Sequence, residues 1–254
     1  MNGLVVLFTV ILVLIDTPVS PWEQAWFRKD ENEANHYCKI CKNHTMCRFP
    51  FDKPGSECLT VGNSHLSDAE IDLILHLHNI AREEIVRASE KNVLHRPTRE
   101  MMQLFWDAEL AKIARRWAVQ CRLFDTDECR NVERFAVLQS VYTYDLEQMQ
   151  QMGNREASKR LEIYIQSWYD TALSLSPVGI GLATPWVTNV GCGRAVYDID
   201  LTEKPGQTKK SYIGKAETLV CNYGRVDDIA RQRPRQDVRL RCIFRSSQYN
   251  KLCG

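Results

Sequence analysis

Apolar residues recur at helical spacing in three separate stretches of the chain. Ser67 and Glu70 form a capping box, and the apolar positions after them, at intervals of three and four, predict a helix over 67–88. A second such pattern begins at Asp107, a suitable N-cap, and predicts a helix that carries its apolar face to Cys121. A third pattern covers 156–169 and contains an aromatic stripe of the kind that usually lies in a core.

The pattern changes after residue 176, where short apolar runs alternate with Pro and Gly. The runs 194–199 and 216–223 predict two β-strands joined by a polar turn at 204–207, and 186–190 is a further short apolar run. Cys192 and Cys221 flank the strand pair and could pin it together. Helices followed by an antiparallel strand pair do not by themselves indicate a function.

An apolar run at the start of the chain, from Leu4 to Ile15, is too short to span a bilayer and is followed by small and turn-forming residues. We interpret residues 1–20 as a secretory signal peptide with its cleavage point near Ser20. A buried or anchoring helix is the alternative. No other stretch is hydrophobic enough to span a membrane, so the sequence predicts a secreted, extracellular protein without a transmembrane segment.

Composition divides the rest of the chain into three parts. Residues 21–66 are rich in Cys, Asn, Lys and Pro and form a loop-rich extension, 67–224 holds the periodic patterns of the main domain, and 225–254 is a basic tail. The formal net charge of +1 points to no nucleic-acid partner. The tail carries eight Lys and Arg against three Asp, which is typical of a solvated segment clipped by Cys242 and Cys253. Weak contact with anionic glycans or a membrane surface is the functional alternative.

Ten cysteines, an even number, follow the secretory signal, so an oxidising pathway should convert them into five disulfides. The alternative is a zinc knuckle at the first four cysteines together with His36 and His44. An exported chain meets oxidants before it meets a metal, and no second Cys-x-x-Cys pair completes the usual zinc spacing. The same region holds an N-glycosylation sequon at Asn43, which we expect to be used in an exported protein.

Several segments together resemble the CAP superfamily, in particular the antigen 5 branch known from arthropod venom and saliva. The resemblance covers about residues 37–224. The first helix carries HNIAR at 78–82, and the second helix carries LFWDAELA followed by RWAVQC, both close to family motifs. The other matching segments are YCKIC with HTMC in the extension, CRNVERF at 129–135, VGCG at 190–193 and LVCNYG at 219–224.

The resemblance implies an α+β fold, a three-layer α-β-α sandwich with a cleft across it. It also implies a function in binding, either of a protein or of a small apolar ligand. Many family members are allergens, and some bind sterols or fatty acids in apolar clefts. It also implies a disulfide pairing, transferred position by position: Cys38–Cys47, Cys41–Cys129, Cys58–Cys121 and Cys192–Cys221, with Cys242–Cys253 as the remaining pair.

Many CAP domains hold a metal with two His and two acidic residues, and the matching positions differ here. They are Thr126, Gln139, Thr171 and Leu182, although antigen 5 relatives often have Gln at the second. The sequence therefore predicts no metal, no cofactor and no metal-dependent catalysis. Asp125, Asp127, Glu128 and Glu133 cluster near the end of the second helix, which is typical of a solvated loop; an unorthodox metal site is the alternative.

Histidine is confined to the first half of the chain, at His36, His44, His65, His76, His78 and His95. An imidazole base in the cleft would have to come from His76 or His78, and His78 occupies an apolar helix face, where a satisfied core histidine is the ordinary case. We therefore expect an exported, non-enzymatic protein that binds a protein target or a small lipid-like ligand. The alternatives are a hydrolase that uses the cleft and a binder of anionic surfaces.

Overall fold

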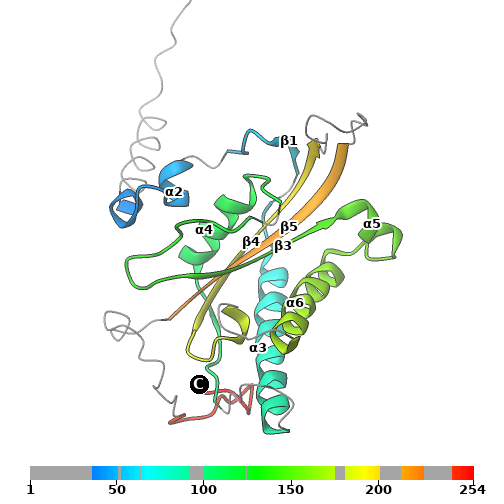
Figure 1. Ribbon diagram of the computed structural model, residues 1–254. Coiled ribbons are helices and arrows are strands. Elements are labelled where there is room, and N and C mark those ends of the chain that lie inside the picture. The colour runs from blue at the N-terminus through cyan, green and yellow to red at the C-terminus, as the bar shows by residue number, and fades with distance from the viewer. Residues whose placement is uncertain are drawn as a thin grey trace, which may run out of the picture.

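The computed structural model describes residues 36–50, 53–62, 64–91, 100–123, 125–174, 181–200, 213–225 and 242–254 (Figure 1). The expected signal peptide, the turn at 204–207 and residues 226–241 of the basic tail lie outside the described residues. Within the described part of the chain, no helix has both the length and the apolar character needed to cross a bilayer.

A mostly antiparallel sheet with the strand order β1-β4-β5-β3 forms the centre of the fold. Strand β4 (Asn189–Asp200) pairs along its whole length with β5 (Ile213–Gly224), and β5 pairs on its other side with β3 (Leu138–Asp145). The other side of β4 carries β1 (Cys58–Val61) and, in parallel, the short β2 (Phe105–Trp106). The two strands expected from the sequence are therefore the middle of the sheet.

Helices cover both faces of this sheet, which makes three layers (Figure 1). Helix α3 (Asp68–Glu90) packs beside α6 (Ala157–Ser174) on one face, and α4 (Ala108–Ala118) lies against β4 and β5 on the other. The short elements are α2 (Thr45–Arg48), α5 (Leu146–Gln151) and the 3₁₀ helix η1 (Gly181–Ala183). The expected α+β sandwich is confirmed.

Side chains alternate between the two faces of the central strands, as the period of a β-strand requires. One face packs under α3 and α6 and contributes Val190, Cys192, Leu219, Cys221 and Tyr223 to the core. The other face packs under α4 and contributes Ala195, Tyr197, Ile199, Ala216 and Val220. Two cores on opposite faces explain why both faces of these strands carry buried apolar side chains, unlike a strand with one face in solvent.

The helix starts follow the sequence signals. Ser67 and Glu70 form the expected capping box, and the Asp107 carboxylate accepts a hydrogen bond from the Leu110 amide at 3.0 Å. The end of α4 differs from the expectation, because the helix stops at Ala118 and Cys121 adopts a left-handed φ of 58°. That turn directs the chain away from the helix and brings Cys121 to its disulfide partner.

Two glycines of β4 allow α4 to lie directly on the sheet. A Cβ atom at Gly191 would stand 2.2 Å from the Ala111 nitrogen, and one at Gly193 would stand 2.2 Å from backbone atoms of Arg115. Real Cβ atoms do not approach other atoms so closely, so any side chain at these two positions would push α4 off the sheet.

Five disulfides fasten the outer segments to this framework: Cys38–Cys47, Cys41–Cys129, Cys58–Cys121, Cys192–Cys221 and Cys242–Cys253. Cys192 and Cys221 do not flank the strand pair but stand opposite each other within the β4–β5 ladder. The extension is also more regular than expected, because residues 36–40 and α2 are helical and β1 is an edge strand of the sheet.

The end of the tail is clipped by Cys242–Cys253 and exposed at most positions, as expected, but part of it packs against the domain. Tyr249 and Leu252 are buried, and the Tyr249 hydroxyl lies 3.0 Å from Nδ1 of His76 on α3. Glu83 of the same helix accepts a hydrogen bond from the Lys251 amide at 2.9 Å. The two buried apolar side chains were too few to stand out in a basic sequence.

Candidate functional site

The four positions that correspond to family metal ligands are in different surroundings. Thr126 is exposed in the loop after α4, and Thr171 on α6 donates its hydroxyl to the Ser167 carbonyl at 2.8 Å. Leu182 in η1 is fully buried in the core under α3 and α6. Gln139 on β3 points to the opposite face of the sheet, towards α4. The structure therefore does not bring these four side chains together.

Gln139 is committed to structural hydrogen bonds. Its Nε2 donates to Asn222 Oδ1 at 2.9 Å, and its Oε1 accepts from the Asp127 amide at 2.8 Å. Asn222 in turn donates to the Leu110 carbonyl of α4 at 3.2 Å. The amide therefore joins β3, β5 and the loop after α4, a task that requires a donor as well as an acceptor.

Asp125, Glu128 and Glu133 are exposed, as expected for a solvated loop, whereas Asp127 is buried and departs from that expectation. Its carboxylate accepts hydrogen bonds from the Thr45 hydroxyl and from the Cys129 amide, the latter at 3.0 Å. Burial raises the pKa of Asp127, although these hydrogen bonds act in the other direction. The carboxylate thus fastens the Cys-rich extension to the loop instead of facing solvent as a metal ligand.

His78 is fully buried on α3, with both ring nitrogens engaged. Nδ1 lies 2.7 Å from the Ile74 carbonyl, and Nε2 lies 3.0 Å from the Tyr223 hydroxyl. Burial lowers the pKa of His78 to about 4, so the ring is neutral near pH 7. The ring lies close to the sulfurs of Cys192 and Cys221, but those sulfurs form one disulfide and offer no thiolate to a metal.

The cysteines and histidines of the suggested zinc knuckle are also engaged. All four sulfurs are in disulfides, so they cannot serve as thiolate ligands. Nδ1 of His44 accepts a hydrogen bond from the Met46 amide at 3.1 Å, and Nε2 lies 2.8 Å from the Asn131 carbonyl. Asn43 beside it is exposed, as a glycan acceptor must be, and its side chain donates to Glu128 at 3.2 Å.

Arg82 is the largest fully buried side chain that sequence analysis did not single out. Its guanidinium donates to five backbone carbonyls at 2.8–3.3 Å: those of Met102, Leu182, Thr184, Pro185 and Val187. Burial lowers its pKa to about 9, so it remains charged at neutral pH. The position of Arg82 one turn after His78, on the same apolar helix face, was the available signal.

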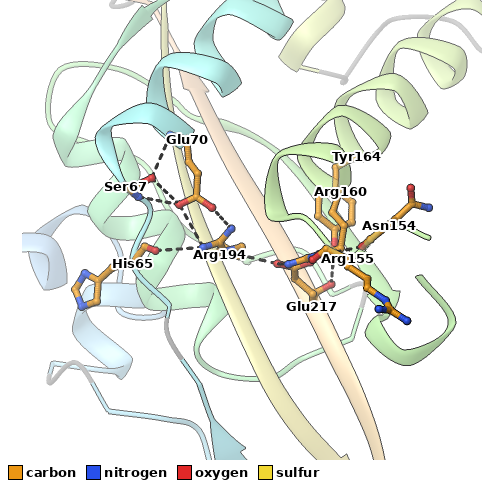
Figure 2. Close-up of polar contacts among 9 residues, drawn as sticks. All are labelled: His65, Ser67, Glu70, Asn154, Arg155, Arg160, Tyr164, Arg194 and Glu217. Atoms are coloured by element: carbon orange, nitrogen blue, oxygen red, sulfur yellow. Dashed lines mark hydrogen bonds and ion pairs between the residues drawn. The ribbon is translucent and has the colours of Figure 1, made fainter. Parts of the chain in front are cut away.

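A second buried charge cluster crosses the sheet (Figure 2). Glu217 on β5, 1% exposed, accepts hydrogen bonds from Arg160 at 2.5 and 3.2 Å and from the Tyr164 hydroxyl at 2.9 Å. Its other neighbour is Arg194 on β4, whose Nε lies 3.7 Å away and whose guanidinium also binds Glu70 at the start of α3. The network links α3, β4, β5 and α6, and its partners are internal, which makes it a structural element.

An open groove with a volume of about 580 Å³ lies between α3 and α6. Its floor and walls are mainly apolar and include Leu77, Ile80, Ala81, Ile163, Ile165 and Tyr169. Three carboxylates also line it, those of Glu84, Glu162 and Asp170. Among the described residues, none with a basic side chain lines the groove, although Arg87 binds Glu84 beside it at 2.5 Å.

Taken together, these features define a disulfide-stapled α+β domain with an apolar groove between α3 and α6. The model of the CAP family, the cysteine-rich secretory protein family, matches residues 75–223. Venom allergen 3 of Solenopsis invicta is 35% identical over 210 residues, which cover 75% of this chain and 85% of that protein. Venom allergen 5 of Vespa magnifica is 31% identical over 219 residues, or 79% and 88% of the two chains.

The crystal structure of NaASP2 with Zn²⁺ is 14% identical in sequence and superposes with a TM-score of 0.44, covering 80% of this chain and all of that one. The identification therefore rests on the family model and on the sequence relatives. The chain belongs to the CAP family, and its relatives are venom allergens of ants and wasps, as the motifs indicated.

Proposed function

We propose that this protein is a secreted binding protein without catalytic activity, and that its ligand is a small apolar molecule held in the groove between α3 and α6. The observation that carries the proposal is the state of the residues that a catalytic centre would need. His78, Gln139 and Leu182 are buried and fixed by contacts inside the fold, and Thr171 is bonded to its own helix. The groove, in contrast, presents apolar side chains to solvent.

The charge of the groove narrows the ligand class. Three carboxylates at its margin, those of Glu84, Glu162 and Asp170, would repel the head group of a fatty-acid anion. An apolar molecule with a neutral or cationic polar end fits this distribution of charge. We therefore do not expect the groove to carry free fatty acids.

Native mass spectrometry of the purified, disulfide-bonded protein tests the proposal. Incubation with a long-chain alcohol should add a single ligand mass, and Ile80→Asp, which places a charge on an exposed wall of the groove, should abolish the addition. Met152→Asp is the matched control, because Met152 is also exposed and apolar but lies outside the groove. A clean apo mass with no uptake would count against ligand binding.

The alternative, a hydrolase, makes a different prediction. Ester or peptide hydrolysis that persists through purification and disappears in His78→Gln would contradict the non-catalytic part of the proposal.

Secretion is the second part of the proposal and has its own support. Five disulfides, an apolar run at Leu4–Ile15 and relatives named as venom allergens all fit an exported protein. Expression of the full chain in insect cells should yield a protein in the medium that begins near residue 21. Removal of N-linked glycans should then lower its mass, and Asn43→Gln should abolish that difference. A product retained in the cell with an intact start would contradict this part.

A further inference from the structure

Two adjacent apolar side chains near the end of the chain, Ile243 and Phe244, are 85% and 75% exposed. Other large apolar residues that stand out on the described surface, such as Met152 and Leu59, are 60% exposed or less. Single exposed apolar residues are ordinary on protein surfaces. Two consecutive ones with almost no contact to the protein require another explanation.

The backbone around this pair is held in place. Cys242, the residue before it, is bonded to Cys253, and the Phe244 carbonyl accepts a hydrogen bond from the Gly254 amide at 3.2 Å. The Ser246 amide donates to the Leu252 carbonyl at 2.9 Å, and Leu252 is fully buried. The loop thus buries Leu252 in the core and exposes Ile243 and Phe244 on a backbone that is closed by the disulfide. Such preorganisation lowers the entropy lost on binding.

Positive charge surrounds the pair in the sequence. Arg245 follows it directly, Arg241 stands two residues before Ile243, and the chain from 225 to 254 has eight basic against three acidic residues. Of the carboxylates that contact this loop, Glu90 pairs with Lys251 at 2.9 Å, and Glu100 accepts a backbone hydrogen bond from the Cys242 amide at 3.1 Å, so the positive excess next to the pair in the sequence comes from Arg241 and Arg245. An apolar pair flanked by cations matches the interface of an anionic bilayer, where aromatic and aliphatic side chains enter the acyl region and basic groups meet phosphates.

We propose that Ile243 and Phe244 are an insertion tip by which this protein adsorbs to membranes that contain anionic phospholipid. The tip supplies the apolar anchor and the adjacent basic residues supply the electrostatic attraction. Either signal alone gives weak binding, and the two together give a specific preference for anionic bilayers. The inference concerns a surface separate from the α3–α6 groove and does not depend on a ligand there.

Vesicle co-sedimentation of the full secreted protein tests the tip. The wild type should bind vesicles of phosphatidylcholine with phosphatidylserine. It should bind pure phosphatidylcholine at least about tenfold more weakly, because that surface has no net negative charge to attract the basic residues. Ile243→Ser with Phe244→Ser should weaken binding to the anionic vesicles by about tenfold or more. Met152→Ser, the matched control at a different exposed apolar residue, should bind as the wild type does. Thermal unfolding of both variants should be unchanged, since neither site contributes to the core.

A heparin column separates a lipid surface from an anionic glycan, because heparin offers sulfates without an acyl phase. The double serine variant should elute from heparin at the same salt concentration as the wild type. Equal vesicle binding by wild type and double variant overturns the proposal. Retention on heparin by a wild type that does not bind anionic vesicles also overturns it and assigns the basic residues to glycans instead.

Discussion

Nε2 of His78 and the hydroxyl oxygen of Tyr223 lie 3.0 Å apart at a point where α3 meets the middle of the sheet, and both side chains are fully buried. The pair closes a contact between two layers, because Nδ1 is held by the Ile74 carbonyl of the helix itself and no ring nitrogen is left for a substrate.

This contact predicts a pH dependence of stability. Burial lowers the pKa of His78 from about 6.5 to about 4, so between these values the unfolded chain binds a proton that the folded chain does not. Stability should therefore fall as the pH drops from about 6.5 to 4, by about 3 kcal/mol from this residue alone. Urea unfolding across this range measures the slope. His78→Gln should reduce the slope, and an unchanged slope would contradict this account.

The buried guanidinium of Arg82 predicts a large effect on stability. Arg82→Met fills much of the same volume but leaves five backbone carbonyls, three of them at buried contacts, without this donor, so we expect a loss of about 3 kcal/mol or more. Arg87→Met on the same helix is the control, since Arg87 is half exposed, and should stay within about 0.5 kcal/mol. Urea unfolding compares the two variants. Similar losses would show that the carbonyl contacts of Arg82 are not what stabilises this region.

The charge network at Glu217 allows a comparison between a buried and a surface ion pair. Glu217→Gln leaves Arg160 and part of Arg194 without a buried counter-charge, and we expect a loss of about 3–5 kcal/mol. Asp198→Asn, which removes the partner of Lys215 at the surface, should have a much smaller effect. Differential scanning calorimetry measures the stability loss of each variant. Because the network joins α6 to the sheet, accelerated amide exchange in α6 should accompany the Glu217 substitution.

The carboxylates of the groove predict ligand selectivity. Among chains of equal length that end in an amine, an alcohol or a carboxylate, affinity should decrease in that order, because the carboxylate end meets like charge. Glu162→Gln with Asp170→Asn should raise affinity for the carboxylate and lower it for the amine, each by several-fold. Competition against a fluorescent ligand provides the measurement. Tightest binding of the carboxylate by the wild type would contradict this assignment of the ligand class.

Local signals were enough to predict much of the fold. The capping box at Ser67 and the N-cap at Asp107 located the starts of α3 and α4, and β-branched runs located most of β4 and β5. The sequence did not reveal β3, because its exposed and buried positions mix Gln, Ser, Thr and Tyr and give no clear alternation. It also did not reveal β1, whose partner strand comes near the other end of the domain.

The buried polar groups were the least predictable part. Asp127 belongs to an acidic run of the kind that is usually solvated, and one of the two groups that bind its buried carboxylate, the Thr45 hydroxyl, is far away in sequence. Glu217 likewise stands in a mostly apolar strand, and its partners come from two other elements, Arg160 and Tyr164 from α6 and Arg194 from β4. Composition and periodicity do not encode such long-range pairing.

The position of β1 has a consequence for how the chain matures. This strand precedes α3, yet its sheet partner among the described residues is β4, which is synthesised after almost all of the domain. Such distant pairing makes folding slow, and the edge of β4 stays open until the first segment returns to it. In an exported chain, Cys58 can therefore meet other cysteines before β4 holds β1 in place, so we expect disulfide isomerisation to increase the yield of the native molecule.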